Sequence, residues 1–271
     1  MTRPDTDMQQ MSFWEHLDAL RTVLIRMAVT LTVAAVALFI AMPRIFDNVI
    51  LWPCDGSFPL YALFNATDGS SHSGILPDLS GDTFHVDLIN INLASQLMVQ
   101  VSTSFHLALV LTFPILIYQL WSFVSPGLYP RERRNARRAF LFANSMFYLG
   151  VAAGYFMVFP IALRFLADYT LSETIRNTLT LDSYIDNFMT ITMLMGIVFE
   201  LPLLAWLLGN MGLLTRRFFS KYRRHAIVAL LIAAAFITPT GDPFSLFAVF
   251  IPLYLLWELG AFLVPPSPSA T

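Results

Sequence analysis

Glu132 is a carboxylate that stands among guanidinium groups. The other charged residues between positions 130 and 138 are five arginines, so this stretch is strongly basic apart from the one acid. A carboxylate can accept two parallel hydrogen bonds from one guanidinium group, which makes it a good acceptor for arginine. Glu132 is therefore a candidate binding residue for an arginine-containing ligand. On spacing alone, the simpler interpretation, an ion pair with Arg133 or Arg134, is preferred.

Glu200 is a second unusual carboxylate, because it lies about two-thirds of the way along an otherwise apolar stretch, residues 183–208. Lipid offers a carboxyl group no hydrogen-bond partner, so the side chain must face another helix or a polar cavity. An ionisable residue inside a membrane is by default a functional candidate. The alternative is a structural hydrogen bond between helices.

No other sequence pattern predicts catalysis. The chain has no metal-binding motif, phosphate-binding loop, dinucleotide fingerprint or nucleophile elbow. Its single cysteine, Cys54, excludes an internal disulfide and a cysteine-based metal site. We interpret His106 as a buried structural donor, because no second metal-type residue lies at helical spacing from it. We therefore expect a protein that is not an enzyme and that uses no cofactor or metal.

The composition is that of a protein that crosses a membrane several times. Of 271 residues, 56% are hydrophobic and only 13% are charged, and the mean hydropathy is +0.64. A soluble domain carries about 25% charged residues. The apolar segments predict an all-α integral membrane protein with six transmembrane helices. The expected spans cover about residues 23–42, 96–121, 139–163, 183–208, 226–238 and 244–264.

The last two spans are expected to be short. Residues 226–237 supply only about a dozen apolar residues before Thr238-Pro239, whereas a full span needs about 20. We expect these two helices to form a hairpin that is joined by a turn at residues 238–243.

Polar segments flank and interrupt the membrane domain, residues 23–263. Residues 1–22 are typical of an amphipathic cytoplasmic segment and lack the features of a cleavable signal peptide. Residues 43–95, between the first two spans, contain six aspartates and only one basic residue. Residues 264–271 are rich in proline and serine, and we expect a disordered tail there.

Lysine and arginine are distributed unequally between the two sides of the predicted domain. One side holds 13 basic residues and the other holds three. By the positive-inside rule, both termini therefore lie in the cytoplasm and the acidic segment 43–95 lies outside. The 13 residues are Arg3, Arg21, Arg26, five between 131 and 138 and five between 216 and 224; the three are Arg44, Arg164 and Arg176.

Four sequence blocks, in order, resemble the TatC family, the receptor subunit of the twin-arginine (Sec-independent) protein translocase. The most specific block reads FPILIYQLWSFVSPGLYPRERR. The others are HLDALR near the N-terminus, GIVFELPLL in the fourth span, and ITPTGDPFSLFAVFIPLYLLWELG at the end. The resemblance extends from about residue 12 to residue 263. It agrees with six helices, two cytoplasmic termini and a short final pair.

The resemblance implies a glove-shaped, cofactor-free protein of the bacterial cytoplasmic (inner) membrane. Members of this family bind the twin-arginine signal peptides of folded proteins at their cytoplasmic face. They recruit the single-span membrane proteins TatA and TatB, and the proton gradient drives export. We accordingly expect signal peptides, TatA- and TatB-type proteins, lipid and further copies of the chain as partners, and no nucleic acid.

The resemblance also assigns candidate residues. Glu132 matches the main acceptor for the signal arginines, and Glu200 matches the buried glutamate on the concave side of the family fold. The other residues of the expected signal-peptide site are Arg21, Phe123, Pro126, Leu128, Tyr129 and Arg134. The expected partner contacts at the final turn are Thr238, Pro239 and Asp242.

The N-terminal block departs from the family at one position. The family usually reads H-L-x-E-L-R, whereas this chain has Ala19 in place of the glutamate. Asp18 or Glu15 could replace it, but each residue step along a helix turns a side chain by about 100°. The external segment around residues 54–82 is also longer than is usual in the family.

Two other interpretations compete with the translocase receptor. The first is a proton-coupled small-molecule transporter that uses Glu200 as its proton carrier. Transporters commonly contain repeated halves with matched broken helices, and the sequence shows no such repeat. The second is a purely structural scaffold, which does not explain a carboxylate inside the membrane.

Overall fold

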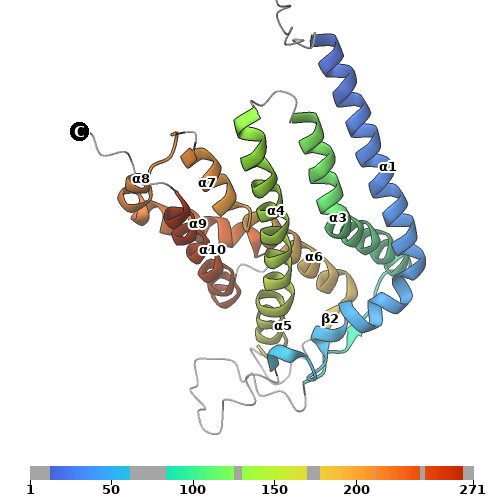
Figure 1. Ribbon diagram of the computed structural model, residues 1–271. Helices are drawn as coiled ribbons and strands as arrows, with labels where there is room; N and C mark the ends of the chain where they lie inside the picture. Colours follow the sequence, from blue (N-terminus) through green and yellow to red (C-terminus); the bar gives the residue numbers. More distant parts are fainter. Residues whose placement is uncertain are drawn as a thin grey trace, which may run out of the picture.

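The computed structural model describes residues 13–61, 84–124, 130–169, 178–210, 212–238 and 242–264. Nearly all of these residues are helical, and Figure 1 shows helices running between two ends of the molecule. Five helical segments are long and apolar enough to cross a membrane. The prediction of an all-α membrane protein is therefore confirmed. Of the expected disordered tail, residues 264–271, only Val264 is described, and it is buried. The rest of the tail and most of the N-terminal segment lie outside the described residues.

The first helix, α1 (Phe13–Ile45), continues without a break through the predicted boundary between residues 22 and 23. Its 33 residues make it about 50 Å long, whereas the apolar core of a bilayer is about 30 Å thick. The segment expected to lie in the membrane interface is thus the first part of one long helix. Because α1 packs chiefly against α3 (Ser95–Val124), it stands at the edge of the molecule (Figure 1).

The polar segment after α1 folds against the helix ends. A π-helical turn η1 (Phe46–Ile50) and a 3-10 turn η2 (Trp52–Cys54) lead into it. A two-residue strand, β1 (Leu88–Ile89), then pairs in parallel with β2 (Leu179–Thr180). Of residues 84–93, only the two residues of β1 form a regular strand. We call this end of the molecule the β1–β2 end.

The middle of the molecule is a close crossing of two helical segments. Helix α4 (Pro130–Ala153), the π-helical turn η4 (Gly154–Val158) and α5 (Phe159–Asp168) follow one another and pack against α6 (Leu181–Val198).

Glycines make this crossing possible. A Cβ atom on Gly150 would lie 2.5 Å from the Met195 carbonyl oxygen, and one on Gly196 would lie 2.8 Å from Val151 Cγ2. These small residues allow the two helix backbones to approach closely.

The predicted fourth span consists of two helices. Helix α6 ends at Val198, and α7 (Leu201–Asn210) begins after a one-turn break at Phe199 and Glu200. Pro202 explains the break, because proline has no N–H group to donate to the carbonyl four residues earlier, which is that of Val198. Glu200 therefore lies at a helix break rather than within an uninterrupted helix.

The last two helices form the hairpin that the sequence predicts, but only the first of them is short, because α10 has 21 residues and is long enough to cross a membrane. A short helix, α8 (Arg216–Lys221), precedes α9 (Arg223–Ile237), which has only 15 residues, and α10 (Pro243–Leu263) packs back against α9 and α7. Most buried apolar residues belong to one core, which involves η1, α3, η4, α5, α6, α9 and α10.

Candidate functional site

The residues of the expected arginine site come from three helices that have one terminus each at the same end of the molecule. Figure 1 shows the start of α1, the end of α3 and the start of α4 at the same end, which we call the α3–α4 end. Arg21 is exposed on α1, and Phe123 is half-buried in the last turn of α3. Pro126, Leu128 and Tyr129 lie outside the described residues. Tertiary structure thus brings together segments that are about 100 residues apart in the chain.

Glu132 and Arg134 occupy the beginning of α4, which starts at Pro130. The first turn of a helix presents free backbone N–H groups and the positive end of the helix dipole, so it favours a negative charge. Proline is well tolerated there because its missing N–H would have no helical partner. Glu132 is thus the third residue of α4, in the turn where a negative charge is favoured.

An acid also remains on α1 despite the departure at Ala19. The Asp18 side chain is exposed and lies three residues before exposed Arg21, whereas Ala19 is half-buried. Residues three apart on a helix are neighbours on its surface. Asp18 thus lies beside Arg21 at the surface of α1. The side chain of Glu15, the other proposed replacement, lies outside the described part of the chain.

Two glutamines of α3 attach α1 to the rest of the protein. Gln119 Nε2 donates to Thr30 Oγ1 at 3.1 Å, near the α3–α4 end. Gln100 Nε2 donates to the Phe39 carbonyl oxygen at 2.9 Å, near the opposite end. Gln119 is not among the residues predicted from the sequence, although a glutamine in an apolar span indicates a hydrogen bond to another helix.

Glu200 is half-buried at the break between α6 and α7. Its Oε1 atom is buried and has no hydrogen-bond partner within the described residues, while its backbone N–H donates to the Ile197 carbonyl oxygen. A buried polar atom of this kind normally receives a hydrogen bond, from protein or from water. The interpretation of Glu200 as a purely structural link between helices therefore gains no support from the described contacts.

A second carboxylate inside an apolar helix has a clear partner. Glu258 of α10 accepts a hydrogen bond from Arg223 of α9, with 2.8 Å between Nη2 and Oε2. The pair joins α10 to the beginning of α9. Glu258 falls within the predicted last span, residues 244–264, but no partner was predicted for it. The requirement that an acid inside a membrane helix be paired could have indicated it.

Two of the three expected partner-contact residues have structural roles at the final turn. Thr238 is buried, and its hydroxyl donates to the Ala234 carbonyl oxygen at 2.9 Å. Asp242 caps α10, because its Oδ1 accepts from the Ser245 N–H at 2.7 Å. Pro239 lies outside the described residues.

His106 has the structural partner that the sequence led us to expect. Its Nε2 lies 3.1 Å from Thr192 Oγ1, and the Thr192 hydroxyl donates to the Phe188 carbonyl oxygen at 2.6 Å. Since that hydroxyl hydrogen is already used, the imidazole N–H is the donor to Thr192. The contact joins α3 to α6. No group of three or more metal-binding side chains occurs among the residues that the structure describes.

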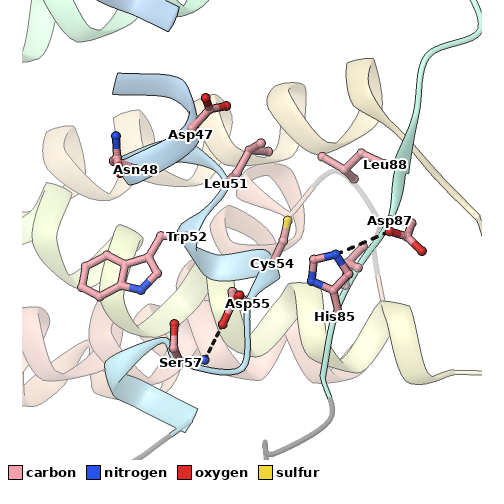
Figure 2. Close-up of a pocket in the computed structure, with 11 residues that line it drawn as sticks. Asp47, Asn48, Leu51, Trp52, Cys54, Asp55, Ser57, His85, Asp87 and Leu88 are labelled. Carbon is pink, nitrogen blue, oxygen red and sulfur yellow. Dashed lines mark hydrogen bonds and ion pairs between the residues drawn. The ribbon is translucent and has the colours of Figure 1, made fainter. Parts of the chain in front are cut away.

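The β1–β2 end contains an acidic depression of about 600 Å³ between η1, η2 and the residues just before and within β1. Figure 2 shows Asp47, Asp55 and Asp87 around it, together with His85 and the buried Cys54. The Ser57 N–H donates to Asp55 Oδ1 at 2.8 Å, and this bond lowers the pKa of the Asp55 carboxyl. His85 lies 3.4 Å from Asp87 at the surface.

Comparisons with known proteins identify the architecture. The family model for the Sec-independent protein translocase protein (TatC) matches residues 15–252. The Sec-independent protein translocase protein TatC of Blattabacterium sp. subsp. Periplaneta americana is 32% identical over 259 residues, which cover 94% of this chain and 95% of that protein. The protein of the same name from Escherichia coli K12 is 34% identical over 175 residues, or 65% of this chain and 67% of that protein.

Solved structures agree with these relatives. A crystal structure of the twin-arginine translocase receptor TatC superposes with a TM-score of 0.69 at 26% identity, and covers 92% of this chain and 97% of that one. A second crystal structure of this receptor, in DDM, gives a TM-score of 0.71 at 26% identity, with 93% and 100% covered.

Proposed function

The chain belongs to the TatC family of Sec-independent protein translocase proteins, and we propose that its α3–α4 end binds twin-arginine signal peptides through Glu132. A peptide with two arginines carries two guanidinium groups, each of which prefers a planar, ionised acceptor. Arg21, Phe123, Arg134 and the short connection that contains Pro126, Leu128 and Tyr129 would surround the acceptor and orient the peptide.

The observation that supports this proposal best is the position of Glu132 in the first turn of α4. The helix N-terminus favours the carboxylate charge, so the five surrounding arginines are not the only groups that stabilise it. The same arginines repel cations in general. A peptide guanidinium therefore needs a short, well-oriented contact with Glu132, and this requirement would select for peptides that present arginine in the right geometry.

The distribution of basic residues supports an orientation in the membrane, and the family supports a set of partners. With 13 of the 16 basic residues on one side, the α3–α4 end would face the cytoplasm and the β1–β2 end would face the outside of a bacterial inner membrane. TatA- and TatB-type single-span proteins would assemble with the chain, in contact with the final turn at Thr238, Pro239 and Asp242. Energy for export would come from the proton gradient.

The helix break at Glu200 is the one observation that favours a small-molecule transporter, because such proteins commonly bind substrate at broken helices. In such transporters, which commonly consist of two repeated halves, a matching broken helix occurs in the other half. Among the described residues, α1 and α3 of the first half each run through their apolar length as one helix. The receptor function is therefore the better supported of the two.

Site-specific photo-crosslinking tests the proposed binding site. A photoreactive amino acid at position 132, in membranes, should crosslink to a twin-arginine signal peptide and not to the same peptide with both arginines changed to glutamine. A photoreactive group at position 217, which is exposed on α8, serves as the control and should give little crosslink. Equal crosslinking from both positions would exclude Glu132 as the acceptor.

A further inference from the structure

An exposed apolar edge follows β1 at the end of the molecule opposite Glu132. Ile89, Ile91 and Leu93 are 40%, 69% and fully exposed, respectively, and they alternate with two asparagines, Asn90 and Asn92. The chain is extended at Ile89, bends at Asn92 and turns at Leu93. The three apolar side chains are exposed along it, although water would favour polar side chains at such positions.

This edge is held in a fixed orientation by contacts on its other side. Leu88 and Ile89 pair with Leu179 and Thr180 of β2. The Asn92 side chain donates to Asp182 Oδ2 at 3.2 Å. Since Asp182 lies in the first turn of α6, the bend at Asn92 is anchored to the helix bundle, while the side chains of Ile91 and Leu93 on either side of it are exposed.

The anchor extends into the start of the next helix. The Ser95 hydroxyl donates to the other oxygen of the Asp182 carboxylate. The segment thus enters α3 directly, with one carboxylate fixing both its last extended residues and the first residue of the helix. The exposed side chains between β1 and α3 cannot turn inward without breaking these bonds.

The exposed apolar edge is continuous with the outer face of α3. Leu97, Met98, Val101 and Phe105, in the first three turns of α3, are all about half exposed. The apolar stretch Ser95–Phe123 is long enough to cross a membrane, so this face meets lipid. The edge Ile89–Leu93 extends the lipid-facing surface beyond the helix, to the level at which the bilayer ends.

We propose that the segment Ile89–Leu93 is an interfacial anchor, whose three apolar side chains insert into the bilayer leaflet at the β1–β2 end. An extended segment cannot enter the hydrocarbon core, because its unpaired backbone groups would have no hydrogen-bond partners there. At the boundary between headgroups and acyl chains, the backbone stays hydrated while alternate side chains enter the apolar region. The anchor fixes the depth at which β1, β2 and the start of α3 sit.

Fluorescent labels at neighbouring positions test this proposal. Ile91→Cys, Leu93→Cys and, as the matched control, Asn90→Cys are prepared in the full chain with Cys54→Ser, and each is labelled with an environment-sensitive fluorophore. The proteins are placed in phosphatidylcholine nanodiscs with or without brominated acyl chains. All three positions are exposed in the structure, so labelling itself should be equal.

Labels at positions 91 and 93 should emit at shorter wavelength than the label at 90, and brominated lipid should quench them at least twofold more strongly. Iodide in the aqueous phase should quench mainly the label at 90. Water-like emission and equal iodide quenching at all three positions would overturn the proposal. Protection of 91 and 93 that appears only after another protein of the translocase is added would also overturn it, because the edge would then be a protein contact.

Discussion

At the scale of single residues, Glu132 and Glu200 differ in the environments that the fold gives them. Glu132 is the third residue of α4, at the α3–α4 end of the molecule, where a helix N-terminus favours negative charge. Glu200 stands at a helix break with one buried oxygen that lacks a donor within the described chain. The first environment suits recognition of a cation, and the second suits a contact formed only in the assembled translocase.

The change Glu132→Gln keeps the size of the side chain and removes its charge. A hydrogen bond to a charged group contributes about 1.5–3 kcal/mol, roughly twice a neutral one. We expect the affinity for a twin-arginine peptide to fall by about tenfold. Fluorescence titration of the labelled peptide against each variant in nanodiscs measures this affinity. Asp87→Asn, which removes an exposed carboxylate at the β1–β2 end, is the control and should leave affinity unchanged.

The change Ala19→Glu restores the family glutamate on α1. If Glu132 is the main acceptor, the second signal arginine has only weaker contacts, and the new carboxylate should tighten twin-arginine peptides more than single-arginine peptides. The double variant Ala19→Glu, Glu132→Gln should recover part of the affinity that Glu132→Gln loses. Abolished binding in Asp18→Asn alone would show instead that Asp18, exposed beside Arg21, already supplies this acid.

The change Glu200→Ala should abolish transport and leave signal-peptide binding intact, because Glu200 lies at the α6–α7 break and not among the three helix ends of the arginine site. Glu200→Gln should be milder, since a neutral amide still accepts a hydrogen bond. Export of a twin-arginine reporter and peptide titration measure the two effects. Normal export by both variants would contradict a role in transport.

At the scale of elements, the positions of the helices depend on one proline and a few glycines. Pro202 lies four residues after Val198, the last residue of α6, and Gly150 and Gly196 let α4 and α6 cross in contact. These residues act through backbone geometry and hold in place the helix whose first turn carries Glu132. Substitution of these residues should therefore lower the stability of the fold, and signal-peptide binding should change only as a consequence.

The substitutions Gly150→Ala and Gly154→Ala should differ in their effect on stability. The new Cβ at position 150 would lie 2.5 Å from a backbone oxygen of α6, whereas at position 154 its nearest neighbours would be 3.1 Å away. Overpacking costs about 1–3 kcal/mol, so Gly150→Ala should lower the Tm by several degrees and Gly154→Ala by less. Thermal unfolding in detergent gives both values. Equal Tm values would mean that the crossing adapts freely.

At the scale of the whole molecule, the two ends differ in charge. The α3–α4 end includes the start of α4, whose sequence holds five arginines between residues 131 and 138, and the β1–β2 end carries the acidic depression and the paired strands. By the positive-inside rule, this polarity favours an α3–α4 end that faces the cytoplasm. The single native cysteine is buried, so labelling of Cys54 is a poor reporter of orientation.

Introduced cysteines report the orientation better. With Cys54→Ser, Asp87→Cys should react with a membrane-impermeant maleimide in intact cells, whereas Arg217→Cys should react only after the inner membrane is permeabilised. Both side chains are exposed, so accessibility to the reagent depends on the side of the membrane. The reverse pattern would place Glu132 outside the cytoplasm and would rule out the proposed site.

The amino-acid sequence by itself determined the membrane class, the number and order of the spans, the last hairpin and the family. It could do so because each membrane helix satisfies its own backbone hydrogen bonds, so every span is a local apolar run. The basic run around Glu132 is also local, and its position at the start of a helix is consistent with Pro130.

Tertiary structure decided which distant residues meet. The pairs Arg223–Glu258, Gln119–Thr30 and Asn92–Asp182 join separate helices or segments. The sequence showed that polar groups in apolar helices need partners, but several donors were available for each. Helix packing selects one of them, because only the packed molecule fixes the rotation and depth of each helix relative to its neighbours.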